Sequence, residues 1–328
     1  MRGVLSAGLL ACLAGLCGVM GCGNDAPQPV PEITIGGGTD SPNPDPEEPA
    51  AEVMPATDGA ETTEDALEAI GATITRAPDG TIRSISCYRN KRLTDRHLGH
   101  IAENDQLTAL DLRATGLTDI GLKHVSGLQG LEQLYLGGTQ VTADGLASLK
   151  DLTNLKVLNL QDLPVDAQSY TRHLGGLTKI SRLNLAGTRF DDRGLQALAE
   201  LKNLQAIVLP RTVTDTGLTH LAGHIRLETL VLDKTHITDD GIKTFRRLPD
   251  LQRLYLSHTR ITDVALLYLK DNTTCQGLEL SHTRSTNAGL KYLYTLKDLV
   301  GINLTGTRCT EVGIQGLRQA LPKCRIAL

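Results

Sequence analysis

Residues 107–125 read "LTALDLRATGLTDIGLKHV", and close copies of this stretch return along most of the chain. An offset copy starts at Ile82, and "CRIAL" at 324–328 matches a truncated last strand. A period of 23 to 25 residues predicts an array of about ten similar units, none of which can bury a core alone. The first leucine position of these units falls at Leu107, Leu131, Leu155, Ile180, Leu204, Leu227, Leu251, Cys275 and Leu299.

Each part of the repeated pattern has a structural interpretation. The alternation in "LDL" predicts a short strand whose leucines face inward. In "LTDIG", the threonine is expected to cap a turn of helix, the aspartate to face the positive end of that helix, and the glycine to allow close packing against the next unit. Another threonine follows each strand and should place its hydroxyl inward, where it can satisfy the turning backbone. These ladder threonines are Thr115, Thr139, Thr188, Thr212, Thr235, Thr259, Thr283 and Thr307.

The pattern L-x-x-L-x-L-x-x-T-x-I-T-D-x-G-L resembles the leucine-rich repeat. It is similar to the cysteine-containing subtype of F-box proteins and many bacterial repeat proteins, with threonine where that subtype has cysteine. The resemblance covers 82–328 and implies an α/β horseshoe solenoid with one short parallel strand and one helix per 24-residue repeat. Leucine-rich repeats mostly serve as binding scaffolds, so it implies protein–protein interaction. Before the array, "TEDALEAI" predicts a helix and the runs around "APDG" a hairpin, which would make 61–81 an N-terminal cap.

Two units depart from the pattern. The stretch "LQDLPVDAQSY" at 160–170 lacks the ladder threonine, the Thr-Asp pair and the glycine. The stretch "LPRTVTD" at 209–215 is one residue short and has Pro210 at the exit of its strand. We expect a local irregularity here, which is either a tolerated change in surface loops or a shaped binding feature.

The first sixty residues differ in composition from the rest. Residues 1–22 contain one basic residue, an apolar run over 4–20 and then "VMGC", which resembles the lipobox of bacterial lipoproteins and implies lipidation of Cys22. Plain secretion and an uncleaved anchor are the alternatives, although the apolar run is short for a membrane span of roughly 20 residues. Residues 23–60 are rich in proline and acidic side chains, which predicts a disordered tether. The expected location is the inner or outer membrane of a bacterium, on its periplasmic or extracellular face.

Charge is distributed unevenly along the chain. No lysine or arginine lies between Arg2 and Arg76, whereas twelve acidic residues fall in that interval. Residues 76–328 contain 32 basic and 25 acidic residues, although the whole chain has a net charge of −4. A partner that meets the repeats would therefore meet a basic body.

No catalytic motif stands out. The sequence has no G-x-S-x-G, P-loop or H-E-x-x-H motif, so we expect neither enzymatic activity nor a cofactor. His258 and His282 lie one repeat apart with His236 nearby, but no carboxylate or thiol recurs on the same loop, so no metal site is expected. Cys309 and Cys324 could form a disulfide in an exported protein or stay free thiols, and both possibilities remain open.

Ligand binding is expected on the inner wall of the horseshoe, where two strand positions of each unit face outward. Its predicted anchors are Tyr135, Arg182, Arg253 and Tyr255, because tyrosine and arginine dominate binding hot spots. The wall has no aromatic platform for nucleic acid. We therefore expect a protein ligand, bound by a monomer.

A second candidate surface lies beside the repeated threonines of the later units. Stacking at about 4.8 Å per unit would line its cations into one row. The simpler interpretation is a solvated row of loop charges, and the alternative is a docking edge for an acidic partner, including the acidic segment of this chain. This basic edge consists of Arg189, Lys234, His236, His258, Arg260, His282, Arg284 and Arg308.

The sequence as a whole predicts a non-enzymatic, membrane-tethered scaffold for protein–protein interaction at the bacterial cell envelope. An envelope-structural or carbohydrate-binding lipoprotein is the second hypothesis, and a hydrolase is the third.

Overall fold

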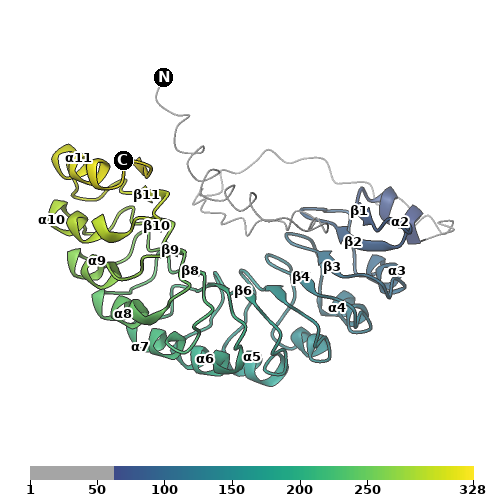
Figure 1. Ribbon diagram of the computed structural model, residues 1–328. Helices are drawn as coiled ribbons and strands as arrows, with labels where there is room; N and C mark the ends of the chain where they lie inside the picture. The colour runs from purple at the N-terminus through teal and green to yellow at the C-terminus, as the bar shows by residue number, and fades with distance from the viewer. Residues whose placement is uncertain (1–62) are drawn as a thin grey trace, which may run out of the picture. The chain divides into compact units, whose positions relative to one another are not determined.

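The computed structural model describes residues 63–328, apart from the side chains of Thr63, Glu64 and Arg247. Over this range the strands form one twelve-stranded sheet in which each strand lies beside the next in sequence order. Strands line the concave side of the array and helices cover its convex side (Figure 1). The predicted α/β horseshoe solenoid is therefore confirmed. The expected signal segment, Cys22 and the acidic tether lie outside the described residues.

A helix and a hairpin begin the array. Helix α2 (Thr63–Ala69) is followed by strands β1 (Thr73–Arg76) and β2 (Ile82–Ser86), which pair antiparallel. Strand β2 then pairs parallel with β3 (Ala109–Asp111), so it belongs both to the hairpin and to the repeat sheet. Leu67 of α2 is fully buried, which shows that this helix covers the first repeat.

From β3 onward every strand has three residues and pairs parallel with the next one. The middle residue of each strand from β3 to β11 is a buried leucine or isoleucine, as the alternation predicts. The strands are β4 (Gln133–Tyr135), β5 (Val157–Asn159), β6 (Arg182–Asn184), β7 (Ala206–Val208), β8 (Thr229–Val231), β9 (Arg253–Tyr255), β10 (Gly277–Glu279), β11 (Gly301–Asn303) and β12 (Arg325–Ala327).

The helices of the convex side are short, and several repeats use a 3-10 turn. The α-helices are α3 (His97–Ala102), α4 (Asp119–Val125), α5 (Ala167–His173), α6 (Asp192–Ala197), α7 (Asp215–Leu218), α8 (Asp239–Lys243), α9 (Asp263–Leu269), α10 (Asn287–Leu290) and α11 (Glu311–Ala320). The 3-10 helices are η1 (Gly145–Leu149), η2 (Leu198–Glu200), η3 (Thr219–Leu221), η4 (Thr244–Arg247) and η5 (Lys291–Thr295). Leucines from strands and helices form one continuous core along the array.

The ladder threonines bond to their own repeat, with one exception. In seven repeats the hydroxyl donates to the carbonyl three residues earlier at 2.6–2.8 Å, as Thr115 does to Leu112. The prediction that these hydroxyls satisfy the turning backbone is confirmed for those repeats. It is wrong for Thr212, whose hydroxyl donates to the carbonyl of Phe190 in the preceding repeat because this unit is one residue short.

The Thr-Asp pair joins neighbouring repeats, which differs from our expectation. The threonine caps its own helix, as Thr118 does by accepting from the amide of Ile120 at 3.2 Å. The aspartate instead accepts from the amide and the hydroxyl of the Thr in the next repeat, at 2.7–2.9 Å and 2.5–2.6 Å. We call this contact the Asp–Thr clasp. Its aspartates are Asp95, Asp119, Asp192, Asp215, Asp239 and Asp263, and Asn287 takes the same place before Thr310.

The clasp explains the repeated glycine. A Cβ at Gly145 would collide with the carboxylate of Asp119, and one at Gly241 would collide with that of Asp215. The close packing that we expected at this position is therefore packing against the aspartate of the preceding repeat.

The clasp is interrupted in the irregular part of the array. Ala143 and Ala167 stand where the aspartate is expected, and the capping residues that follow them are Asp166 and Asp191. Both of these aspartates cap their own helices, with Asp166 accepting from the amide of Ser169 at 2.8 Å. At both junctions the repeat before an aspartate cap therefore has alanine at its clasp position, so two carboxylates do not face each other there.

We predict that Asp239→Ala lowers the free energy of unfolding by about 2 kcal/mol, because Asp239 accepts from the amide and hydroxyl of Thr262 and from the amide of Ala265. The matched control is Asp240→Ala, since Asp240 is the exposed neighbour in the same helix and should change stability by less than about 0.5 kcal/mol. Urea unfolding of the full chain measures both. Equal midpoints for the two variants would contradict the clasp.

Candidate functional site

The concave wall places the four predicted anchors on three strands. Arg182 of β6 and Arg253 and Tyr255 of β9 are partly exposed there. Tyr135 of β4 is only 3% exposed. The expectation that Tyr135 is an open anchor is wrong, because side chains of neighbouring repeats converge on a concave surface and cover its ring.

The most ordered group of the wall surrounds Arg113. Its Cζ lies 4.8 Å from the ring centroid of Tyr88 and 5.1 Å from that of Tyr135. Its Nε and Nη2 donate to the two carboxylate oxygens of Asp111 at 2.9 and 2.7 Å. These hydrogen bonds raise the pKa of Arg113 above its ordinary value. The guanidinium is therefore fixed by two rings and a bidentate ion pair, and we call these four residues the Arg113 cluster.

Tyr88 is the exposed member of the Arg113 cluster. Its side chain is 45% exposed, and the Cζ of Arg89 lies 5.1 Å from its ring centroid. Sequence reasoning missed Tyr88 and Arg113, because each lies just after its strand, directly behind the buried Cys87 or Leu112 and two residues beyond the last strand position of its repeat. A large side chain at this position was the available signal, since the equivalent residues of other units include Gly137 and Ala186.

Two carboxyl groups, Asp233 and Glu279, lie in the later part of the wall, with Arg253 and Tyr255 of β9 in the repeat between them. Asp233 accepts from the amide of Ser257 at 2.7 Å. Glu279 of β10 is 8% exposed and accepts from the amide of Ser281 and from Asn303 Nδ2, each at 2.9 Å. Asp233 was also missed, for the reason that applies to Arg113.

Burial raises the pKa of Asp233 to about 6, and the charge of Glu279 adds to this effect although the amide of Ser257 opposes it. Burial likewise raises the pKa of Tyr255 between these two carboxyl groups. The two parts of the wall therefore differ in chemistry, because the Arg113 cluster offers an aromatic ring and a fixed cation whereas the later part offers carboxyl groups.

The residues of the basic edge are exposed, apart from Lys234, which is partly exposed. Lys234, His258 and His282 have backbone φ angles of 61°, 57° and 57°, in the left-handed region. The imidazole rings of His258 and His282 stack with centroids 4.2 Å apart and planes inclined by 15°. Arg189 lies apart from the others, because Thr212 takes the equivalent position in the intervening short repeat. The structure therefore brings together the members of the edge from Lys234 onward.

Residues 63–328 contain neither a disulfide nor a cluster of metal-ligating side chains. The cysteines Cys87, Cys275, Cys309 and Cys324 are free, so the possible bridge between the last two is not formed. Burial raises the pKa of Cys275 to about 12, which makes its thiol unreactive. No group of three or more histidine, cysteine or carboxylate side chains in this range could hold a metal ion.

No helix within the described range is long and apolar enough to cross a membrane.

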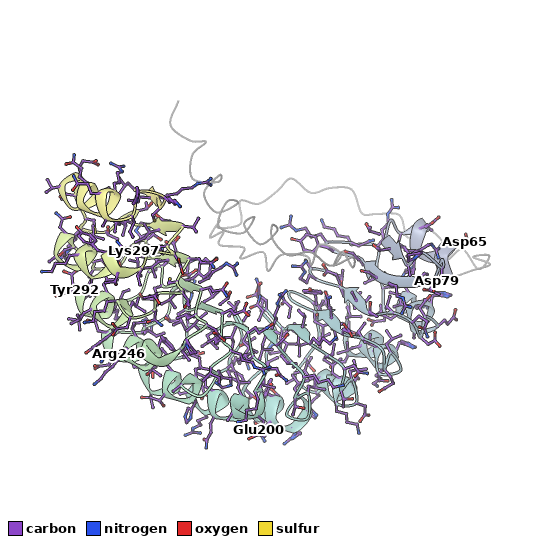
Figure 2. The ribbon with its side chains drawn as sticks, viewed as in Figure 1. Asp65, Asp79, Glu200, Arg246, Tyr292 and Lys297 are labelled. Carbon is purple, nitrogen blue, oxygen red and sulfur yellow. The ribbon has the colours of Figure 1, made fainter. Side chains whose placement is uncertain are left out.

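The convex side has a shallow hollow lined by polar residues. Arg246 lies on this side (Figure 2), with Nη2 3.6 Å from the carboxylate of Asp271, and Lys243 and Thr244 line the same hollow. Both side chains of this ion pair are exposed, so it contributes little to stability. Nothing in the described part of the chain gives positive evidence for catalysis, whereas both the wall and the edge are suited to binding.

Comparison with known proteins agrees with this geometry. A leucine-rich repeat model matches residues 176–199. An internalin of Listeria monocytogenes superposes with a TM-score of 0.54 at 18% identity, over 81% of this chain and 88% of the internalin. A leucine-rich repeat protein of Leptospira interrogans gives a TM-score of 0.54 at 24% identity, over 70% of this chain and 56% of that protein.

A third similar structure is the ectodomain of the plant receptor kinase GASSHO1/SCHENGEN3 from Arabidopsis thaliana, in complex with CASPARIAN STRIP INTEGRITY FACTOR 2. Its TM-score is 0.50 at 17% identity, over 80% of this chain and 32% of that one. No curated protein sequence matches the chain. The matched repeat and the shared fold show a leucine-rich repeat fold, which is typical of protein–protein interaction. The cysteine-containing subtype stays a resemblance of sequence.

We predict that Asp233→Asn stabilises the protein near pH 7.5 by about 1 kcal/mol, a value discounted for the partial exposure of Asp233. The folded chain holds the Asp233 proton up to about pH 6, whereas the ordinary pKa of a free aspartate side chain is 3.8. Folding therefore takes up a proton between these values, and the contribution of Asp233 to stability falls as pH rises through that window. Asparagine keeps the acceptor for Ser257 and removes the charge that faces Glu279.

Urea unfolding at two pH values tests this assignment. The gain should disappear near pH 4, where Asp233 is protonated in the folded protein. Asp240→Asn is the control, because Asp240 is exposed and should show no such difference. A variant at Asp233 that is destabilised at both pH values would contradict the prediction.

Proposed function

We propose that the protein is a non-enzymatic scaffold that binds another protein on its concave wall. The observation that carries this proposal is the Arg113 cluster, in which Arg113 is held by Asp111 and two tyrosine rings while Tyr88 stays 45% exposed. Because this group is ordered before any ligand arrives, binding would cost it little conformational entropy. Tyrosine and arginine are also the residues that most often dominate protein interfaces.

A similar structure in complex with its ligand supports the proposal that the ligand of this chain is a protein. The plant ectodomain of the same fold is in complex with CASPARIAN STRIP INTEGRITY FACTOR 2. For this chain we propose a monomer that binds one protein partner, with no nucleic acid involved. The wall lacks the row of exposed aromatic rings that single-stranded nucleic acid requires, since Tyr88 is the one aromatic residue among the strongly exposed large side chains of the described range.

Capture from envelope fractions tests the wall. The immobilised full chain should retain a defined protein, and Tyr88→Ala should reduce its affinity by about tenfold, because an exposed, ordered tyrosine is a typical hot spot. Val312→Ala is the matched control, since Val312 is 78% exposed on the convex helix α11. Calorimetry with the recovered protein measures both affinities.

Three outcomes would contradict this assignment. Equal affinities for both variants would remove the Arg113 cluster from the interface. Retention on purified wall polymer without a protein would favour the carbohydrate-binding alternative. Turnover in a panel of hydrolase substrates would favour an enzyme.

We further propose that the scaffold is exported and held at a bacterial envelope membrane by a lipid on Cys22. The support is the sequence alone, namely the apolar run over 4–20 and the "VMGC" that ends at Cys22. The acidic segment 23–60 would then separate the repeats from the bilayer, because like charges along a chain repel one another.

Replacing the lipidated cysteine tests this second proposal. We predict that Cys22→Ala moves the protein from the membrane pellet to the soluble fraction, because the lipid is the expected anchor. Cys17→Ala is the matched control, since Cys17 lies within the apolar run and should leave the protein in the pellet. Firm pelleting of the Cys22 variant would show that the lipoprotein interpretation is wrong.

A further inference from the structure

The basic edge presents cations from four consecutive repeats in two rows. The residue before the repeated threonine supplies the first row, and the residue after it supplies the second. Neighbouring strands lie about 4.8 Å apart, so members of a row follow each other at close to that spacing. The first row is Lys234, His258 and His282, and the second is His236, Arg260, Arg284 and Arg308.

The backbone of the second row is fixed while its side chains remain open. The amides of Arg260, Arg284 and Arg308 donate at 3.0–3.1 Å to carbonyls of the preceding repeats. Their side chains are exposed, and none of them forms an ion pair with another described residue. These arginines therefore stand at a regular spacing and form no ion pair within the described range.

The carboxylates that follow the edge residues in sequence are hydrogen-bonded in the Asp–Thr clasp and form no ion pair with the arginines. Asp239 and Asp263 follow the edge residues closely in sequence, but their oxygens accept from Thr262 and Thr286. A row of like charges repels itself and contributes nothing to folding, so an external anion is the partner that it fits. An extended polypeptide that crosses four repeats would present about five residues to the edge.

The stacked histidines make this surface sensitive to pH. Two protonated imidazoles at 4.2 Å would repel each other, and Lys234 adds a third positive charge. Burial, the ring of His282 and Lys234 lower the pKa of His258, whereas Glu279 raises it. An anion placed on the edge would offset this repulsion and favour protonation of His258.

We propose that the basic edge binds an acidic segment of a partner protein, and that His258, which is stacked on His282, takes up a proton when that segment binds. This inference rests on the proposed protein-binding function and names the chemistry of the partner. A polypeptide fits better than a nucleic acid, because the only rings of the edge are three histidines. Two of these, His258 and His282, are stacked on each other, so the edge has no row of open rings for bases.

The test uses the full chain and a fluorescent synthetic peptide of alternating glutamate and serine. Fluorescence anisotropy near pH 7.5 and near pH 5.5 gives the dissociation constants, and the affinity should be severalfold higher at the lower pH because imidazoles titrate between these values. Binding should weaken strongly as salt rises above about 0.15 M, where exposed charges are screened within about 8 Å. A glutamine–serine peptide of the same length should not bind.

Two variants separate the rows. Replacing Arg260, Arg284 and Arg308 with glutamine should weaken binding about tenfold, as expected for the loss of three exposed charge pairs. Replacing His258 and His282 with asparagine should remove the pH dependence, so that the dissociation constants at the two pH values become about equal. Asparagine is chosen because it tolerates the left-handed backbone of these positions.

A third variant controls for net charge. It carries glutamine at Lys123, Lys150 and Arg172, which are exposed on the helical side of earlier repeats. The control should bind the peptide as tightly as the wild type and unfold at the same urea midpoint as the arginine variant.

The proposal is overturned if the arginine variant and the control bind alike, if affinity does not change with pH in the wild type, or if oligothymidylate of equal charge binds more tightly than the peptide. Tyr88→Ala should leave peptide binding unchanged. Failure at the edge with normal capture of a protein by the wall would refute this inference alone, and loss of capture with normal peptide binding would refute the wall assignment alone.

Discussion

No repeat of this chain can bury its leucines by itself, and this constraint organises the rest of the structure. Each strand from β3 onward has three residues, so its buried middle residue is covered only when the neighbouring repeats are in place. The parallel pairing holds the strands about 4.8 Å apart and in the same register along the array. Every position of the repeat therefore becomes a row of similar residues, and a favourable or unfavourable contact between neighbours is repeated many times.

The Asp–Thr clasp shows how the chain uses this repetition. One aspartate satisfies an amide and a hydroxyl of the next repeat, and glycine leaves room for its carboxylate. The same row would be destabilising if aspartate occupied both sides of a junction. Where the helix cap is Asp166, the clasp position of the preceding repeat is occupied by Ala143. Where the cap is Asp191, that position is occupied by Ala167. The irregular part of the array thus keeps its helix caps at the cost of two links between repeats.

Rows also determine what the surfaces can bind. On the concave side, neighbouring side chains converge, which covers Tyr135 and fixes Arg113 between groups from different repeats. On the edge, side chains point away from the sheet and remain open, so Arg260, Arg284 and Arg308 keep their charges exposed. The wall is therefore a surface of ordered groups, and the edge is a surface of regularly spaced charge. One can supply shape and the other long-range attraction for the same partner.

The sequence alone was sufficient to predict the solenoid, because the period, the alternating leucines and the ladder threonines act within one repeat or through its nearest neighbours. It also located the basic edge, since equivalent positions must stack. It did not show where the clasp aspartates bond, how Tyr135 becomes buried, or that Tyr88, Arg113 and Asp111 form one cluster. These features depend on the distance and angle between successive repeats, and on which side chains a curved sheet brings together. The pattern of one repeat carries no information about that curvature, so only the tertiary structure decided them.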